Sequence, residues 1–338
     1  MVQITVEGKT EEQSFECEQD DTILRAALRA GKGFPYACNV GSCGNCRFQL
    51  LDGEVEHARE DAPAWGERDL KRNRYLGCQA HPKGDCRIKL RFDDAYTPEI
   101  LPARTEMTLK AKSTITHDIS EFFFELKTPT PFLPGQYALL GLPGVDGGRA
   151  YSMSNVTKEG SEWHFQIKRV PNGAATTCLF DRVNTGDTIK LDGPYGTAFL
   201  REDAPRDILC LAGGSGLSPM VSITRAAAVS DKLKGRQIDF VFGGRATRDV
   251  CGREFLEELP GFGDRIRFHA AISNPGPEDA DWDGHTGFVH DVAHEIFGDS
   301  IRDKEIYFAG PPPMAQAVQK LLFDLKVPPE QIHFDEFY

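Results

Sequence analysis

The sequence lacks the features of a membrane protein or an exported protein. Its longest apolar runs, such as Ile208–Ala212, are far shorter than the roughly 20 residues that cross a bilayer. Met1–Ile4 contains no basic stretch followed by an apolar one, so we expect no export signal and a cytoplasmic location. Positive charge is also scarce. A net charge of −12 argues against nucleic acid or an anionic membrane as the main partner.

Signs of disorder or of a fibrous repeat are missing as well. The 40% apolar and 27% charged fractions are ordinary for a globular chain. Because domains average about 150 residues, the 338 residues predict two or three domains.

Cysteine is too sparse for a disulfide scaffold, and nine cysteines cannot all pair. Five of them nevertheless fall between Cys38 and Cys86. In a chain without an export signal, such a cluster indicates metal ligands.

The patterning divides the chain into three predicted domains, residues 1–95, 104–204 and 205–338. The first has short strands around one helix, Thr22–Ala30, and we expect Asp93–Arg104 to be a linker. Its predicted strands are Val2–Glu7, Gln13–Glu18, Arg47–Leu51 and Cys86–Phe92.

The second domain is rich in strands separated by Pro-Gly and Asn-Gly turns, which favours an antiparallel barrel. Its predicted strands are Phe122–Lys127, Tyr137–Leu142, Arg149–Asn155, Trp163–Val170 and Thr188–Asp192. The third alternates strand and helix, which predicts a parallel sheet that binds ligands at the carboxyl ends of its strands. Its predicted elements are strands Asp207–Ala212, Gln237–Phe242, Arg265–Ile272 and Glu305–Ala309, and helices Met220–Val229 and Pro313–Leu325.

The strongest motif is Cys38-x4-Cys43-x2-Cys46, followed by Cys78. This spacing is the plant-type pattern for a [2Fe–2S] cluster. Gly41 and Gly44 lie between the ligands, where the loop must turn its amides toward sulfur. The alternative is a structural zinc site with four cysteine ligands, although zinc ligands usually come as two short Cys-x2-Cys pairs. Cys17 and Cys86 lie outside the pattern, and we interpret them as inert thiols.

A second motif offers the groups that a flavin needs. Arginine suits a diphosphate, an aromatic ring can stack on the isoalloxazine, and a hydroxyl can bond its N5. A glycine turn before a short helix can present amides to phosphate. These candidates are Arg149, Tyr151, Ser152, Lys168, Gly173, Ala174, Ala175 and Thr176. The alternative is a solvated arginine beside a core tyrosine.

Two glycine loops each follow a predicted strand and precede a predicted helix, which favours a nucleotide cleft over two plain turns. The first is Gly213-Gly214-Ser215-Gly216, after which Ser218 is expected to cap the helix and Pro219 to begin it. The second contains Gly310, Pro311 and Met314.

With these motifs, the chain resembles the reductase components of multicomponent aromatic-ring oxygenases, in the ferredoxin–NADP reductase superfamily. The likeness is most specific at Phe34–Cys46, Arg149–Ser152, Gly213–Pro219, Gly310–Met314 and His333–Tyr338. Asp61–Pro63 and Asn73–Gln79 are most similar to the carbazole dioxygenase and toluene monooxygenase reductases. The resemblance implies a multidomain α+β and α/β fold: a β-grasp ferredoxin domain, an antiparallel β-barrel FAD domain and a Rossmann-like NAD domain.

The same resemblance implies the cofactors and their residues. FAD would lie on Arg149, Tyr151 and Ser152, and NADH across the two glycine loops. The family often ends on an acid followed two residues later by an aromatic that covers the flavin. Asp335 and Phe337 match that pair, and Tyr338 follows. Ala309 stands where the family usually has a cysteine, which puts the speed of nicotinamide oxidation in question.

The preference for NADH over NADPH depends on the predicted strand end before Arg245. Arg245 and Arg248 could bind a 2′-phosphate, but Gly244 replaces a serine that is common in NADP enzymes, and Asp249 would repel phosphate. We therefore expect NADH.

The predicted function follows from the cofactors. NADH gives two electrons together, a cluster takes one, and a flavin can stand between them. The expected partner is an oxygenase component, Rieske or diiron, or a separate ferredoxin. We expect this chain itself to be a monomer. The alternatives are a reductase for a sugar-deoxygenation dehydratase, or a zinc-binding module without enzymatic activity. Glu11, Glu12, Glu16, Glu18, Asp20 and Asp21 form either a solvated edge or a patch that steers a basic partner.

Overall fold

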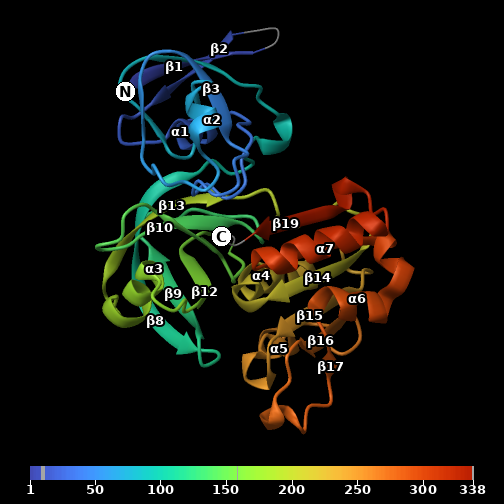
Figure 1. Ribbon diagram of the computed structural model, residues 1–338. Coiled ribbons are helices and arrows are strands. Elements are labelled where there is room, and N and C mark those ends of the chain that lie inside the picture. Colours follow the sequence, from blue (N-terminus) through green and yellow to red (C-terminus); the bar gives the residue numbers. More distant parts are fainter. Residues whose placement is uncertain (9–11, 158, 337–338) are drawn as a thin grey trace.

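The computed structural model describes residues 1–8, 12–157 and 159–336, and for residue 336 only the backbone. Figure 1 shows three bodies: an N-terminal domain above a barrel, and a parallel sheet with helices beside the barrel. The C-terminal strand ends where the three meet. In the described part of the chain, no helix is long and apolar enough to span a membrane.

The N-terminal domain is a five-stranded sheet with one helix packed on it, which is the β-grasp arrangement that was predicted. The order is β2-β1-β7-β3-β5, with β1 and β7 parallel. Helix α1 (Ile23–Arg29) buries Ile23, Leu24 and Leu28, and the hydroxyl of Thr22 accepts a hydrogen bond from the Arg25 amide. The strands are β1 (Val2–Glu7), β2 (Glu12–Cys17), β3 (Arg47–Asp52), β5 (Arg74–Leu76) and β7 (Cys86–Lys89). A small ribbon, β4 (Val55–His57) with β6 (Ala80–Pro82), and helix α2 (Glu67–Leu70) complete it.

The second domain is an antiparallel six-stranded barrel in the order β11-β10-β13-β8-β9-β12. Its interior is packed with aromatic side chains such as Phe122, Trp163 and Phe165. The strands are β8 (Ala103–Thr114), β9 (Ile119–Leu126), β10 (Tyr137–Gly141), β11 (Arg149–Ser152), β12 (Glu162–Lys168) and β13 (Thr188–Tyr195). The short helix α3 (Ala174–Thr177) follows β12.

The expected linker was wrong at its end. Ala103 and Arg104 already pair with Gly193 and Asp192 as the start of β8, a long strand that the alternation of residue types did not reveal. The remaining connection is short, with a helical turn at Asp94–Tyr96. It is tied to the first domain, because the Asp93 amide donates to the Gly33 carbonyl.

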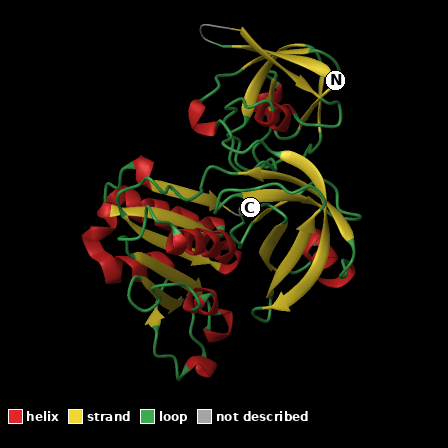
Figure 2. Ribbon diagram, turned by 180° about the vertical axis from the view of Figure 1, so that it is seen from behind, coloured by secondary structure: helices red, strands yellow, loops and turns green. Residues whose placement is uncertain are grey.

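The third domain is a parallel sheet in the order β17-β16-β15-β14-β18-β19. Helix α4 packs on one face, while α6 and α7 pack on the other, so its central strands are buried on both sides. The strands are β14 (Asp207–Gly213), β15 (Ile238–Gly244), β16 (Ile266–Ile272), β17 (His285–Thr286), β18 (Lys304–Gly310) and β19 (Ile332–Glu336). The helices are α4 (Leu217–Val229), α5 (Arg253–Glu257), α6 (Val289–Phe297) and α7 (Pro312–Asp324). Figure 2 shows this sheet from behind, with its strand ends directed at the barrel.

Candidate cofactor sites

The four predicted cysteine ligands come together beneath the loop between α1 and β3. Gly41 and Gly44 have φ of +88° and +82°, values that favour glycine, and they turn the loop around the sulfur atoms. The amides of Ser42 and Cys43 both donate to Cys38 Sγ at 3.3 Å. Backbone amides aimed at sulfur stabilise a thiolate, so the loop is built for a charged cysteine ligand.

The sulfurs are arranged as two pairs. The Cys38 thiol donates a hydrogen bond to the Cys43 sulfur and lowers the pKa of Cys43 to about 5. In the same way, the Cys46 thiol donates to Cys78 and lowers the pKa of Cys78. Among the described residues, no three cysteine sulfurs lie within 4.8 Å of one another. Around a single zinc ion, with Zn–S near 2.3 Å, all four would lie about 3.8 Å apart. Two separated pairs fit one iron each, so these residues fit a [2Fe–2S] cluster better than zinc.

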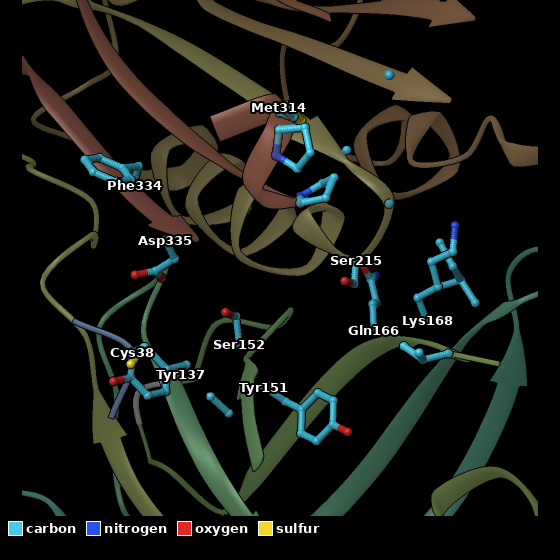
Figure 3. A pocket seen from close by; sticks show the side chains of 18 of the residues that line it. Cys38, Tyr137, Tyr151, Ser152, Gln166, Lys168, Ser215, Met314, Phe334 and Asp335 are labelled. Carbon is cyan, nitrogen blue, oxygen red and sulfur yellow. The ribbon is translucent and has the colours of Figure 1, made fainter. Parts of the chain in front are cut away.

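A cavity of about 1220 Å³ lies at the junction of the three domains. It exceeds the roughly 300–1,000 Å³ of a site for one small ligand. Cys38 and Cys43 reach it from the first domain, Tyr151 and Ser152 from the barrel, and Ser215 and Asp335 from the third domain. Figure 3 shows side chains of all three domains directed into this space. The geometry therefore offers one shared chamber rather than three isolated sites.

The barrel side of the cavity holds the predicted flavin residues. Tyr151 and Ser152 lie at the end of β11 and pair with Ala138 and Tyr137 of β10. The Ser152 hydroxyl is buried without a hydrogen-bond partner among the described residues, which is the orphan a flavin nitrogen would satisfy. Burial raises the pKa of Tyr151 to about 12, so its phenol stays protonated. Gly173, Ala174, Ala175 and Thr176 also line the chamber.

Two predicted cations are already engaged. The Arg149 guanidinium is exposed and donates to the carbonyls of Asp146, Gly147 and Gly148. Lys168 Nζ lies 3.1 Å from Asp118 Oδ2. Both side chains still line the cavity, where a diphosphate would compete for them.

The two glycine loops converge on one methionine. A Cβ on Gly213 would lie 2.5 Å from Met314 Sδ, and a Cβ on Gly310 would lie 2.6 Å from the same atom. A Cβ on Gly216 would lie 1.9 Å from the Ala309 carbonyl oxygen. Only glycine at position 216 permits this approach of the loop after β14 to the end of β18, so the loops form the cradle that a dinucleotide needs. Ser215 and Pro311 line the cavity beside them.

The expected role of Ser218 as a helix cap was wrong. Helix α4 begins at Leu217 without a side-chain cap. The Ser218 hydroxyl instead donates to the Ser152 carbonyl at 2.7 Å and accepts from the Gln166 amide. The residue therefore joins the third domain to the strand that carries the flavin candidates, a contact that no local pattern announces.

Arg245 does line the cavity, but its charge is largely neutralised. Its Nε and Nη2 donate to the two carboxylate oxygens of Asp249 at 2.8 and 3.1 Å, and Asp118 lies 3.9 Å away. Arg248 is exposed. A 2′-phosphate would have to displace Asp249 from Arg245.

The C-terminal strand brings Asp335 to the cavity beside the first domain. Asp335 is half-buried, and the loss of solvation there raises its pKa to about 7. Phe334 stacks on Phe308 with ring centroids 4.8 Å apart. The predicted flavin cover, Phe337, lies outside the described residues, as does Tyr338.

Several lining residues were not assigned to the site from the sequence. They are Tyr36, Ala37, Tyr137, Gln166, Phe288 and His290. The Phe288 side chain is 62% exposed and stacks on His290. Nothing in the neighbouring sequence distinguishes it from an ordinary surface phenylalanine. Tyr137 looks like barrel core, because it lies in an apolar strand. Only the docking of domains assigns either residue to the cavity.

Comparisons with known proteins agree with this geometry. Family models match residues 4–83 as a 2Fe-2S iron-sulfur cluster binding domain, 106–199 as an oxidoreductase FAD-binding domain and 210–320 as an oxidoreductase NAD-binding domain. The chain is 37% identical to a ferredoxin–NAD(P)+ reductase, CarAd, of Metapseudomonas resinovorans, over all of both chains. It is 36% identical to the ferredoxin–NAD+ reductase component of an alkene monooxygenase system of Xanthobacter autotrophicus, covering 96% and 98% of the two chains. The solved ferredoxin reductase in carbazole 1,9a-dioxygenase superposes with a TM-score of 0.89 at 35% identity, covering 100% and 98%.

Proposed function

The chain belongs to the ferredoxin–NAD(P)+ reductases that combine a 2Fe-2S domain with FAD- and NAD-binding domains, and on this premise we propose that it carries electrons from NADH to an oxygenase component. The observation that carries the proposal is the shared cavity. Two cluster cysteines, the flavin strand β11 and both glycine loops line the same space. Electrons can therefore pass within one chain.

When bound, FAD accepts two electrons from NADH and releases them singly to the cluster. The chain's own residues position the groups. Ser152 would offer its unpartnered hydroxyl to the flavin edge, Tyr151 would offer its ring, and the Gly213 and Gly310 loops would hold the nucleotide. The amides of the Cys38 loop stabilise thiolate charge at the cluster.

NADH is the proposed donor because Asp249 occupies Arg245. The carboxylate holds the Arg245 guanidinium through two hydrogen bonds, so a 2′-phosphate would have to compete with Asp249 for this cation. It would also repel that phosphate.

The acceptor is proposed from the relatives' names. One relative serves an alkene monooxygenase system, and the superposed structure belongs to a carbazole dioxygenase. We propose a Rieske or diiron oxygenase component, or an intermediate ferredoxin, as the acceptor of this chain. We also propose that this chain works as a monomer in the cytoplasm, where NADH is available.

The test compares two acceptors after Cys46→Ser. Ferricyanide can take electrons from the flavin, whereas cytochrome c is expected to need the cluster. We expect NADH-dependent cytochrome c reduction to fall at least about tenfold while ferricyanide reduction persists, because the one-electron carrier is lost. Each assay is run in parallel with NADPH, which should be the poorer donor.

Cys86→Ser is the matched control. Its thiol lies in the same domain and donates only to the Glu54 and Gly84 carbonyls, which a serine hydroxyl can also reach. Cys86→Ser should leave both rates unchanged. Equal loss of both activities in Cys46→Ser would contradict the assigned order of electron flow.

A further inference from the structure

Part of the acidic run of the first domain contacts the barrel, while Glu16 is exposed and Glu11 lies outside the described residues. Arg104, at the start of the barrel, lies 3.1 Å from Glu18, 3.2 Å from Asp20 and 2.8 Å from Asp21. Glu12 pairs with Arg87. Three of the six acids therefore bind across the junction between the first domain and the barrel, which neither interpretation of the sequence anticipated.

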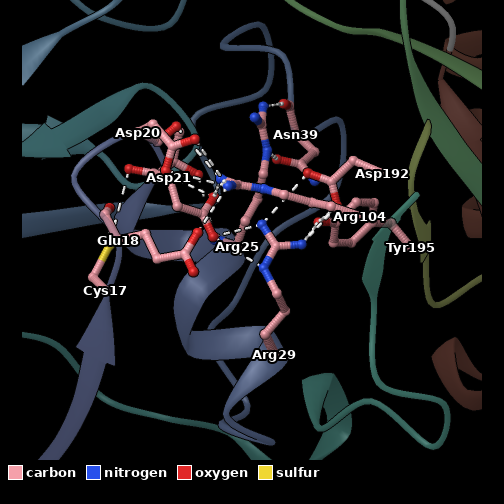
Figure 4. Close-up of polar contacts among 11 residues, drawn as sticks. Cys17, Glu18, Asp20, Asp21, Arg25, Arg29, Asn39, Arg104, Asp192 and Tyr195 are labelled. Carbon is pink, nitrogen blue, oxygen red and sulfur yellow. Dashed lines mark hydrogen bonds and ion pairs between the residues drawn. The ribbon is translucent and has the colours of Figure 1, made fainter. Parts of the chain in front are cut away.

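A second arginine crosses the same junction and is more enclosed. Arg29 of α1 lies 2.5 Å from Asp21 and 2.6 Å from Asp192 of β13. The Tyr195 hydroxyl donates to Asp192 and accepts from Arg29. The Asp21 and Asp192 side chains are only 4% and 16% exposed, so solvent screens this pair weakly. Figure 4 shows both arginines among these carboxylates.

A third contact connects β10, the neighbour of the flavin strand β11, to the cluster loop. The Tyr137 hydroxyl donates to the Ala37 carbonyl at 2.6 Å, and Ala37 directly precedes Cys38. On β10, Tyr137 is the ladder partner of Ser152. The route from the flavin candidate to a cluster ligand is therefore one strand pair and one hydrogen bond. Nearby, the Gly196 amide donates to the Tyr36 hydroxyl at 2.8 Å.

These contacts bury aromatic surface that belongs to both domains. Tyr137, Leu139 and Tyr195 of the barrel pack within the same apolar cluster as Tyr36 and Phe34 of the first domain. Burial also raises the pKa of Tyr137, so its phenol remains a donor at every physiological pH. Buried polar groups at this interface between the first domain and the barrel must keep their hydrogen-bond partners. The interface, which we call the joint, therefore has one preferred geometry.

We propose that Tyr137 is a positioning residue that holds the cluster loop against β10, beside the flavin strand β11, with Arg29 and Asp192 as a second anchor between the two domains. The inference rests on the proposed function. Reduced flavin is the donor and the oxidised cluster the acceptor of one electron at a time. The proton that leaves the flavin goes to solvent, and no bond to Tyr137 or Arg29 forms or breaks.

The test is rapid mixing of the holoprotein with NADH, in which flavin and cluster absorbance are followed separately. In Tyr137→Phe we expect the ratio of the cluster rate to the flavin rate to fall by roughly fivefold to tenfold, the change in a docking equilibrium that loss of one buried hydrogen bond produces. Iron content and the spectrum of the dithionite-reduced cluster should match the wild type. Tyr307→Phe, which loses a hydroxyl bonded to the Arg201 amide, should leave the ratio unchanged.

The second variant does not touch the cavity. Arg29→Gln should lower the same ratio and speed hydrogen exchange of the Gly196 amide, which the docked Tyr36 protects. Exchange reports the joint independently of activity. Arg87→Gln removes an arginine whose partners Glu7 and Glu12 lie within the first domain, and it should change neither quantity.

The inference would be overturned if Tyr137→Phe and Arg29→Gln both kept the wild-type ratio of cluster rate to flavin rate and the wild-type exchange of the Gly196 amide. The proposed function would then remain intact. Loss of iron from either variant would also overturn it, because the joint would then be needed for the loop's own fold. If NADH reduced no cluster in the wild type, the proposed function itself would fail.

Discussion

The nine cysteines have different chemistry because their sulfurs lie in different surroundings. In the cluster loop, hydrogen bonds from the Cys38 thiol and from the backbone lower the pKa of Cys43 to about 5. Burial raises the pKa of Cys17 to about 12, and the Cys86 thiol donates to backbone carbonyls. Ligand spacing separated the two groups in the sequence. The hydrogen bonds to Cys43 and the burial of Cys17 explain why the two groups differ.

A prediction at this scale concerns Asp335. Its pKa is about 7 in the fold against 3.8 for an ordinary aspartate, because the half-buried carboxyl loses solvation. The folded state therefore keeps a proton that the unfolded state loses above about pH 4. The stability from this group is complete below pH 3.8 and is lost as the pH rises to about 7.

Asp335→Asn removes this dependence. We expect the Tm of the variant, relative to the wild type, to rise by at least about 2 °C between pH 5 and pH 8. Thermal unfolding of the holoproteins across that range provides the measurement. A constant difference between the two Tm values at every pH would contradict the assignment.

The residues that patterning missed share a physical cause. Ser218 occupies a capping position in the sequence, yet its hydroxyl bonds Ser152 of another domain. Tyr137 reads as a core aromatic, yet its hydroxyl reaches Ala37. Local propensity contains no information on a partner that lies far along the chain. These roles follow only from the packing of domains.

At the scale of elements, Gly216 decides how closely the loop after β14 approaches the end of β18. Gly216 lets the loop after β14 rest against the Ala309 carbonyl at the end of β18. In Gly216→Ala the new Cβ must push this loop away from the Ala309 carbonyl. Overpacking of this kind costs about 1–3 kcal/mol, so we expect the KM for NADH to rise on the order of tenfold.

Gly235→Ala is the matched comparison, because nothing lies within 4 Å of a Cβ at that position. Steady-state ferricyanide reduction at varied NADH measures both variants. An unchanged KM in Gly216→Ala, with Gly235→Ala also unchanged, would show that the approach of the loops does not shape the nucleotide site.

Elements with strong signals were predicted within a few residues, for example β1 at Val2–Glu7 and α4, which begins at Leu217 rather than Met220. Strand β8 was not, because Ala103–Thr114 is mostly polar and only its middle is buried. Strand β19 was not predicted, because only the resemblance of His333–Tyr338 to other family endings singled out this segment. Its pairing with β18 brings Asp335 to the cavity.

At the scale of the whole molecule, three domains enclose one chamber. Motifs identified each cofactor separately, since each motif is local. The joint of Arg29, Asp192 and Tyr137 determines that the cluster loop faces that chamber. The sequence pattern of a single domain cannot predict how the cluster loop is oriented toward the other two domains. The consequence is that electrons need not leave the chain between NADH and the cluster.

The measurement that tests this account most directly is an anaerobic titration of the purified holoprotein with NADH, followed by electron paramagnetic resonance and metal analysis. We predict two iron atoms per chain and the signal of a one-electron-reduced [2Fe–2S] centre on adding NADH. The signal should be absent in Cys46→Ser. Zinc in place of iron, or iron that stays oxidised while NADH is consumed, would contradict the account.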